Sequence, residues 1–192
     1  EKTWVVRTAD HGESLNEHGY MGHTRKLYQQ MLHVPLLISG PGVVAQRSDA
    51  PSRGIDMATT LLGVAGVPAA PGMLGLDLLR TPPEAGRIRV VETFGGTVPT
   101  TEAGRAEMAT RPPKLQAVLR EAWKLIVGPR VQLFDLEADP LELEDLETLH
   151  PEKAATLDEE IDTWSAEVPR GESDAAELSP EDIEALRANG YL

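Results

Sequence analysis

Two short apolar runs rich in β-branched residues constrain the fold most, because their length and composition fit buried strands better than helices. Residues 3–8 (TWVVRT) lead directly into a polar loop, and residues 34–39 (VPLLIS) end at the turn sequence Gly-Pro-Gly. Pro35 fits only the start or the edge of the second strand. Residues 28–32, between the two runs, predict a short helix.

A longer helix is predicted from Asp56, whose carboxylate can accept hydrogen bonds from the free amides of the first turn. Apolar residues then recur at helical spacing until Gly66, which is followed by Pro68 and ends the helix. Strands that alternate with helices predict an α/β fold, in which a mixed sheet is flanked by helices.

The second half of the chain predicts a smaller antiparallel unit. Residues 87–94 read as a strand, the Gly-, Thr- and Pro-rich segment 95–113 as an exposed loop, and residues 115–119, 123–127 and 131–136 as three short strands. From residue 151 the chain is acidic and helical in pattern, and Ser-Pro-Glu-Asp at 179–182 predicts the start of a terminal helix. We therefore expect two units, 1–113 and a C-terminal subdomain, 114–192, of a small antiparallel sheet and acidic helices.

Composition excludes several classes of function. The 18 basic and 31 acidic residues give a net charge of −13, so a nucleic acid would be repelled. No apolar run approaches the ~20 residues of a membrane-spanning helix, and the start of the chain does not read as a signal peptide. The absence of cysteine excludes disulfides and thiolate catalysis, but it does not identify the compartment.

The densest polar cluster lies directly after the first predicted strand. Residues 10–23 hold three of the five histidines, together with three acidic residues and three glycines. Asp10 and His11 would place an oxygen and a nitrogen donor side by side, which is a common way to bind a divalent cation. An ordinary Asx turn is the alternative interpretation of the same residues. Two donors do not complete a metal site, so further ligands must come from elsewhere.

These residues resemble the sulfatase family of the alkaline phosphatase superfamily. The resemblance is carried by TADHGESLNEHG at 8–19, Gly22-His23, Leu27-Tyr28, VPLLISGPG at 34–42, IDMATTLLGVAGVP at 55–68, WKLI at 123–126 and QLFDLEADP at 132–140. The ending LRANGYL at 186–192 resembles a frequent ending of bacterial sulfatases. The resemblance implies an alkaline-phosphatase-like fold, with residues 1–113 as the C-terminal portion of a catalytic domain.

The resemblance also implies roles for individual residues. Asp10 and His11 would be ligands of a divalent cation, usually Ca²⁺, with Mn²⁺ and Zn²⁺ as alternatives. His23 would contact sulfate oxygens or protonate the leaving alcohol, and His18 is a weaker candidate for the pocket lining. Thr24 occupies the position where relatives carry a lysine, and Lys26, which is displaced by two residues, is interpreted as part of a solvated helix face. His33 and His150 carry no motif, so we expect surface or packing roles for them.

No nucleophile is identified in this chain. Sulfatases carry Cys or Ser followed by x-Pro-x-Arg, in which the first residue is oxidised to formylglycine. Residues 49–53 (DAPSR) have the proline and arginine at matching offsets, but aspartate cannot become formylglycine, and the segment follows the Asp-His loop instead of preceding it. Because the chain starts at Glu1 and reads at once as a strand, we expect the nucleophile and the remaining ligands in a preceding N-terminal half.

Three functions therefore remain open. The first is a hydrolase of small-molecule or glycan sulfate esters, represented here by its C-terminal portion, for which the family implies a periplasmic or secreted location. The second is a phosphoryl-transfer enzyme of the same superfamily, such as a phosphodiesterase or a phosphoethanolamine transferase, because a metal-binding Asp-His loop serves that chemistry equally well. The third is a non-catalytic remnant or acidic interaction module, in which the strands at 3–8 and 34–39 would keep unpaired edges.

Overall fold

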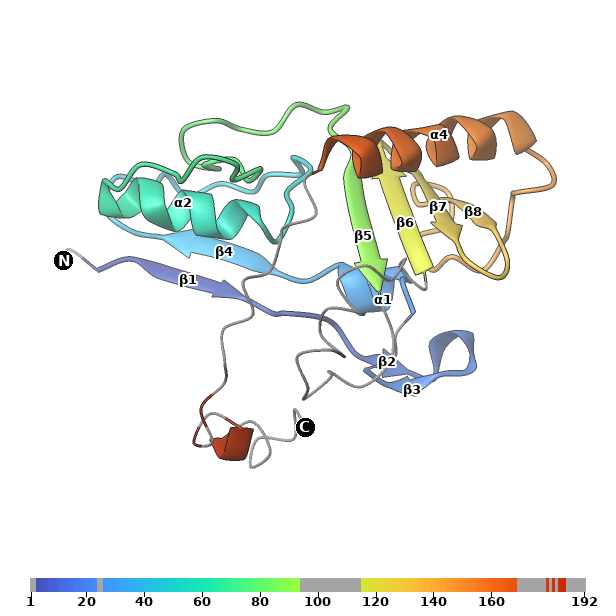
Figure 1. The fold of residues 1–192 in the computed structure, drawn as a ribbon, viewed down its shortest axis with the longest axis horizontal. Helices are drawn as coiled ribbons and strands as arrows, with labels where there is room; N and C mark the ends of the chain where they lie inside the picture. The colour runs from blue at the N-terminus through green and yellow to red at the C-terminus, as the bar shows by residue number, and fades with distance from the viewer. Residues whose placement is uncertain are drawn as a thin grey trace.

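The computed structural model describes residues 3–23, 26–93 and 115–168, together with residues 179, 181 and 183–185. Its first strand, β1 (Val5–Thr8), pairs antiparallel with β4 (Leu36–Ser39), so that Val5 lies opposite Ser39 and Thr8 opposite Leu36. Pro35 directly precedes β4, as expected. The α/β fold class is confirmed, and Figure 1 shows the β1–β4 ribbon lying below α2 and beside the larger sheet.

Three small elements lie between these two strands. The strands β2 (Ser14–Leu15) and β3 (Met21–Gly22) form a hairpin around the 3-10 turn η1 (Glu17–Gly19). The helix α1 (Gln29–Leu32) follows and confirms the short helix that the sequence predicts. Its Met31 side chain is buried, so α1 is anchored against the rest of the chain.

The strands β1 and β4 are less buried than the sequence suggests. Val5 on β1 is 58% exposed and Leu37 on β4 is 56% exposed. In the described residues the two strands form a two-stranded sheet of their own, so each has one paired and one open edge. Their apolar composition therefore indicates a strand correctly, but the expected burial is not present among the described residues.

The helix α2 (Asp56–Ala65) ends where the sequence predicts, because Gly66 adopts a left-handed backbone conformation with φ 71°. Its start differs from the expectation. Asp56 is fully buried, and its carboxylate accepts hydrogen bonds from the amides of Arg53 and Leu76 instead of those of the first turn. Both carboxylate oxygens also accept from the Arg87 guanidinium, each at 2.7 Å. Asp56 thus joins three separate loops to the start of α2.

The main core lies on a four-stranded antiparallel sheet in the order β5–β6–β7–β8. Its strands are β5 (Arg89–Thr93), β6 (Leu115–Arg120), β7 (Trp123–Val127) and β8 (Gln132–Asp135). The small C-terminal sheet is confirmed. Its first strand, β5, lies before residue 113, so this sheet crosses the expected unit boundary, which stays a prediction.

Each face of this sheet is covered by a different part of the chain. The long helix α4 (Pro151–Glu167) runs across the strands of the sheet in Figure 1. Its Ala154, Leu157 and Ile161 side chains pack on one face of that sheet. Leu27 and Tyr28 pack on the other face, against a cluster that includes Phe134. The C-terminal sheet therefore carries the segment that leads into α1.

The other expected elements lie in segments that the structure describes only in part or not at all. The amide of Ile183 donates to the Ser179 carbonyl at 3.1 Å, which is the hydrogen bond of a first helical turn at the predicted start of the terminal helix. The loop expected at 95–113 and the helix end at Gly190 lie outside the described residues. Among the helices of the described part of the chain, none has the length and apolar content to cross a membrane.

We expect Asp56→Ala to lower the free energy of unfolding by about 3–5 kcal/mol, because the change leaves the Arg87 guanidinium partly buried without its anion. Urea denaturation at pH 7 measures this loss. The matched control is Asp49→Ala, since Asp49 pairs with Arg47 where both side chains are almost fully exposed. An unfolding curve for Asp56→Ala that overlays the control would contradict the structural role of this carboxylate.

The same pair predicts an acid dependence. Burial alone would raise the pKa of Asp56, but the hydrogen bonds from Arg87 and from the Leu76 and Arg53 amides lower it below its ordinary value. A carboxyl whose folded-state pKa is lowered contributes stability above its unfolded pKa, and this contribution is lost as the pH falls below about 4. We therefore expect the free energy of unfolding to fall less between pH 5 and pH 3 in Asp56→Ala than in the parent protein.

Candidate functional site

The candidate site begins at the loop that leaves β1. Gly12 lies against α1, where its amide donates to the Met31 carbonyl at 2.9 Å. A Cβ atom at Gly12 would lie 1.8 Å from the Gln30 carbonyl oxygen, so only glycine allows this approach of loop and helix. The loop that carries Asp10 and His11 is therefore held between β1 and α1.

Asp10 and His11 present one oxygen and one nitrogen side by side. The His11 amide donates to Asp10 Oδ1 at 2.9 Å, and this bond is the main cause that lowers the pKa of Asp10 below its ordinary value. His11 Nδ1 lies 2.8 Å from the Gly12 carbonyl, which can only accept, so Nδ1 carries the hydrogen. In the neutral ring Nε2 then keeps its lone pair, and it lies 3.8 Å from Asp10 Oδ2.

His23 lies close to this pair. Its ring centroid is 5.5 Å from that of His11, and its Nδ1 is 3.6 Å from Glu13 Oε2. The His23 side chain is 73% exposed, so the ring can be reached by a solute. The structure thus brings Asp10, His11 and His23 together, and the roles expected for them stay predictions.

Glu13 is a member of this cluster that the sequence did not indicate. The β2–β3 hairpin sets Ser14 opposite Gly22, which places Glu13 and His23 next to each other at the open end of the two strands. The two-residue strands are too short to be recognised by alternation of apolar and polar residues. The glycines at 19 and 22, both with positive φ, were the available signal for a turn.

His18 lies in a different environment. Its ring stacks on Tyr28 with centroids 3.8 Å apart, and its Nε2 is 3.1 Å from the Leu141 carbonyl oxygen. These contacts attach the η1 turn to the C-terminal part of the chain. Lys26, by contrast, extends its Nζ over the Tyr20 ring, 4.7 Å from the centroid.

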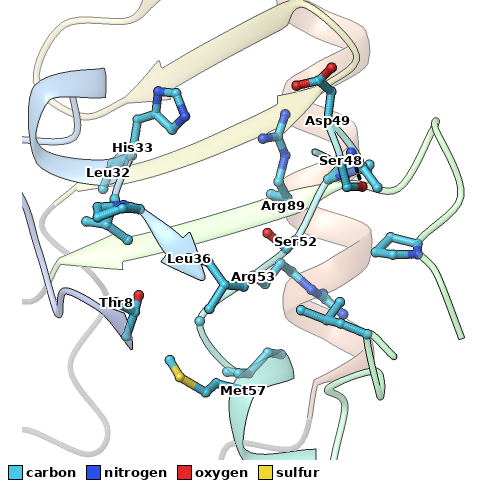
Figure 2. A pocket seen from close by; sticks show the side chains of 18 of the residues that line it. Thr8, Leu32, His33, Leu36, Ser48, Asp49, Ser52, Arg53, Met57 and Arg89 are labelled. Carbon is cyan, nitrogen blue, oxygen red and sulfur yellow. Dashed lines mark hydrogen bonds between the residues drawn. The ribbon is translucent and has the colours of Figure 1, made fainter. Parts of the chain in front are cut away.

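A broad hollow of about 1760 Å³ opens beside Asp10 and His11. Figure 2 shows Thr8 and Leu36, from the β1–β4 ribbon, on one side of it and Arg53 and Arg89 across the space. Each of these two guanidinium groups has a buried Nε without a hydrogen-bond partner among the described residues. His33 and the segment from Asp49 to Arg53 also line the hollow.

The donor set fits a divalent cation only in part. Asp10 offers a carboxylate oxygen and His11 an imidazole nitrogen, which are donors of the required kind, 3.8 Å apart. Among the described residues, however, no group of three His, Cys, Asp or Glu side chains is placed to hold a metal ion. A cation held by Asp10 and His11 would need further ligands from outside the described residues.

Comparison with known families and sequences shows what the chain is similar to. A family model described as "Sulfatase" matches residues 1–67, which include the candidate site. The chain is 32% identical over 168 residues to arylsulfatase K of Bos taurus, covering 84% of this chain and 30% of that protein. It is 30% identical over 185 residues to choline-sulfatase of Rhizobium meliloti, covering 93% of this chain and 30% of that protein. The chain thus spans about a third of the length of these relatives.

Two solved structures share the fold. A 2-O GAG sulfatase superposes with a TM-score of 0.67 at 20% identity, covering 84% of this chain and 35% of its own. The phosphonate monoester hydrolase of Agrobacterium radiobacter superposes with a TM-score of 0.67 at 19% identity, covering 93% and 38%. At this level of identity the comparison defines the architecture and leaves the chemistry open.

We expect Gly12→Ala to lower the free energy of unfolding by roughly 1–3 kcal/mol, because the added methyl group must push the loop away from the α1 backbone. Urea denaturation measures the loss, and the NMR signals of His11 report the shift of the loop. Gly86→Ala is the matched control, since a Cβ at Gly86 would meet nothing within 4 Å. Equal effects of the two substitutions would show that the close approach at Gly12 is not required.

Proposed function

We propose that the chain belongs to the sulfatase family, whose model matches residues 1–67, and that it forms the C-terminal portion of a hydrolase of sulfate esters. In this proposal, Asp10 and His11 contribute two ligands to a divalent cation, and His23 contacts the anion. The observation that carries the proposal is the free Nε2 of His11 beside the Asp10 carboxylate, with the His23 ring next to them. Because the chain spans about a third of its relatives, the activity belongs to the whole protein.

The residues of this chain prepare the metal site in a definite way. The Gly12 carbonyl fixes the tautomer and the orientation of His11, which is the usual role of a second partner behind a metal-bound imidazole. We propose Ca²⁺ as the cation, from the family resemblance, with Mn²⁺ and Zn²⁺ as alternatives that the imidazole nitrogen also suits. When bound, such a cation supplies electrostatic stabilisation of the negative charge on the ester oxygens.

His23 is proposed to act on the ester itself. Its exposed ring lies beside His11, so an N–H of His23 can donate to a sulfate oxygen or pass its proton to the departing alcohol. Glu13, 3.6 Å from Nδ1, limits the orientations that the ring can take. The nucleophile, expected as formylglycine, and the remaining ligands are assigned to the part of the protein that this chain does not span.

The substrate class follows from the named relatives and stays a proposal for this chain. They are an arylsulfatase, a choline-sulfatase and a GAG sulfatase, which supports a small-molecule or glycan sulfate ester. A bacterial origin is proposed from the ending at 186–192, while the relatives named above come from both a mammal and a bacterium.

Phosphoryl transfer is the second candidate function. The observation in its favour is the shared fold with a phosphonate monoester hydrolase. The relatives at 30–32% identity that cover most of this chain are named as sulfatases, which favours sulfate esters. Turnover of matched sulfate and phosphate monoesters of one alcohol by the whole protein distinguishes the two candidates.

We expect Asp10→Asn to weaken binding of the divalent cation by at least about tenfold, because the neutral amide is a poorer ligand than a carboxylate. Isothermal titration with Ca²⁺, Mn²⁺ and Zn²⁺ measures the change, and a chelator should abolish turnover by the parent protein. The control is Glu152→Gln, because the Glu152 carboxylate is largely exposed beside His150 and does not line the hollow. Unchanged affinity in Asp10→Asn would remove Asp10 from the metal site.

We expect His23→Ala to lower turnover of a sulfate ester by about 10²–10⁴-fold, which is the usual contribution of a positioned proton donor. The thermal unfolding midpoint should stay the same, because the side chain is largely exposed. His150→Ala is the matched control, since His150 packs against Trp123 at the start of α4. Equal turnover in His23→Ala and the parent would contradict the proposed role.

A further inference from the structure

A buried ion pair lies outside the candidate site. Lys124 on β7 and Glu142, in the segment after β8, both have fully buried side chains, and Lys124 Nζ lies 2.6 Å from Glu142 Oε1. Buried charges are kept in proteins when they are paired and their remaining hydrogen-bonding positions are used. The second oxygen of Glu142 therefore requires a partner.

That partner belongs to the segment that carries the candidate site. Glu142 Oε2 accepts a hydrogen bond at 2.5 Å from the amide of Gln29, the first residue of α1. The Glu142 backbone adopts φ 57°, a left-handed conformation that is unfavourable for a glutamate. A backbone conformation of this kind persists where the surrounding contacts impose it. At Glu142 it occurs together with a carboxylate that bonds both to Lys124 on the sheet and to the first residue of α1.

From α1 the contacts continue to the loop that carries Asp10 and His11. Gly12 donates to the Met31 carbonyl on α1 and leaves no room for a Cβ against Gln30. The Gly12 carbonyl in turn accepts from His11 Nδ1. An unbroken series of hydrogen bonds and short helix backbone thus runs from Lys124 to the imidazole of His11.

We propose that Glu142, held by Lys124, is a positioning residue for the Asp10–His11 pair. This inference rests on the proposed function, since it assigns Glu142 a role in the reaction only if Asp10 and His11 bind the cation. Glu142 does not touch the reacting groups. It fixes the first turn of α1, and α1 fixes Gly12 and the orientation of His11.

Two further contacts attach the same segment to the C-terminal part of the chain. His18 Nε2 lies 3.1 Å from the Leu141 carbonyl, and the Tyr28 hydroxyl donates to Gln132 Oε1 at 3.0 Å. These contacts hold the segment on the sheet when Glu142 is changed. The loss of Glu142 should therefore loosen α1 and Gly12 without releasing the whole segment.

The test compares two double substitutions in the whole protein, both of which avoid leaving a lone buried charge. Lys124→Met with Glu142→Leu removes the acceptor of the Gln29 amide, whereas Lys124→Met with Glu142→Gln keeps a side-chain carbonyl in its place. Amide hydrogen exchange at Gly12 and Gln29 and steady-state turnover of a sulfate ester are measured well below the unfolding midpoint. Arg130→Gln is the control, because Arg130 pairs with Asp145, which lies outside α1, and the Arg130 side chain is largely exposed.

We expect the leucine pair to raise exchange at both amides at least about tenfold and to lower kcat about tenfold with little change in KM, the scale usual for groups behind a metal ligand. The glutamine pair should show a clearly smaller effect, and Arg130→Gln should match the parent. Faster exchange at Gln29 with unchanged exchange at Gly12 would overturn the inference, because the ion pair would then stabilise α1 alone.

If the leucine pair does not fold, the glutamine pair is compared with the parent, and joint acceleration at Gln29 and Gly12 supports the link while acceleration at Gln29 alone overturns it. If Asp10→Asn leaves cation binding unchanged, the proposed function fails. Exchange at Gly12 still decides whether Glu142 controls the loop, so the two failures are distinguishable.

Discussion

The packing of apolar side chains on both faces of the β5–β8 sheet is the interaction on which the rest of the structure depends. Val118, Leu125 and Leu133 are fully buried under α4, and Ala117, Ile126 and Phe134 are buried on the opposite face. A fully buried aliphatic side chain contributes roughly 1.5–3 kcal/mol. Among the residues that the structure describes, the candidate site has no comparable core of its own, so its loop takes its position from this sheet through α1.

The N-terminal part is held chiefly by polar contacts instead. Asp56 joins Arg53, Leu76 and Arg87 around the start of α2, and Thr60, also buried, accepts from the Leu78 amide and donates to the Asp56 carbonyl. The buried Lys124–Glu142 pair likewise joins β7 to the start of α1. Burial lowers the pKa of Lys124 to about 8, although Glu142 opposes this shift. Polar groups with several partners thus define the geometry where apolar burial is sparse.

Local patterns in the sequence were sufficient for the longer strands and the helices, and they marked residues 10–23 as a polar cluster. The two-residue strands β2 and β3 were missed, and the roles of Asp10, His11 and His23 stay predictions from the family resemblance. Gly66 ends α2 as predicted, because a positive φ at a helix end is a local property of glycine. The prediction that Asp56 caps the first turn of α2 was wrong, because its carboxylate accepts from Leu76 and Arg87, which lie 20 and 31 positions away. A carboxylate at a helix start indicates a cap when only its sequence neighbours are known. The Lys124–Glu142 pair could not be predicted either, because burial of a charged residue depends on contacts distant in sequence. The low burial of β1 and β4 also could not be read locally, since it depends on which neighbours cover a strand.

The open edges of the β1–β4 ribbon have a consequence for handling the protein. In the described part of the chain, each of these strands offers one row of free amide and carbonyl groups beside exposed Val5 and Leu37. Such an edge is a template for strand pairing between molecules. At high concentration this chain would add the ribbon of one copy to that of the next, so self-association is expected to rise with concentration and to be suppressed by any partner that covers the edge.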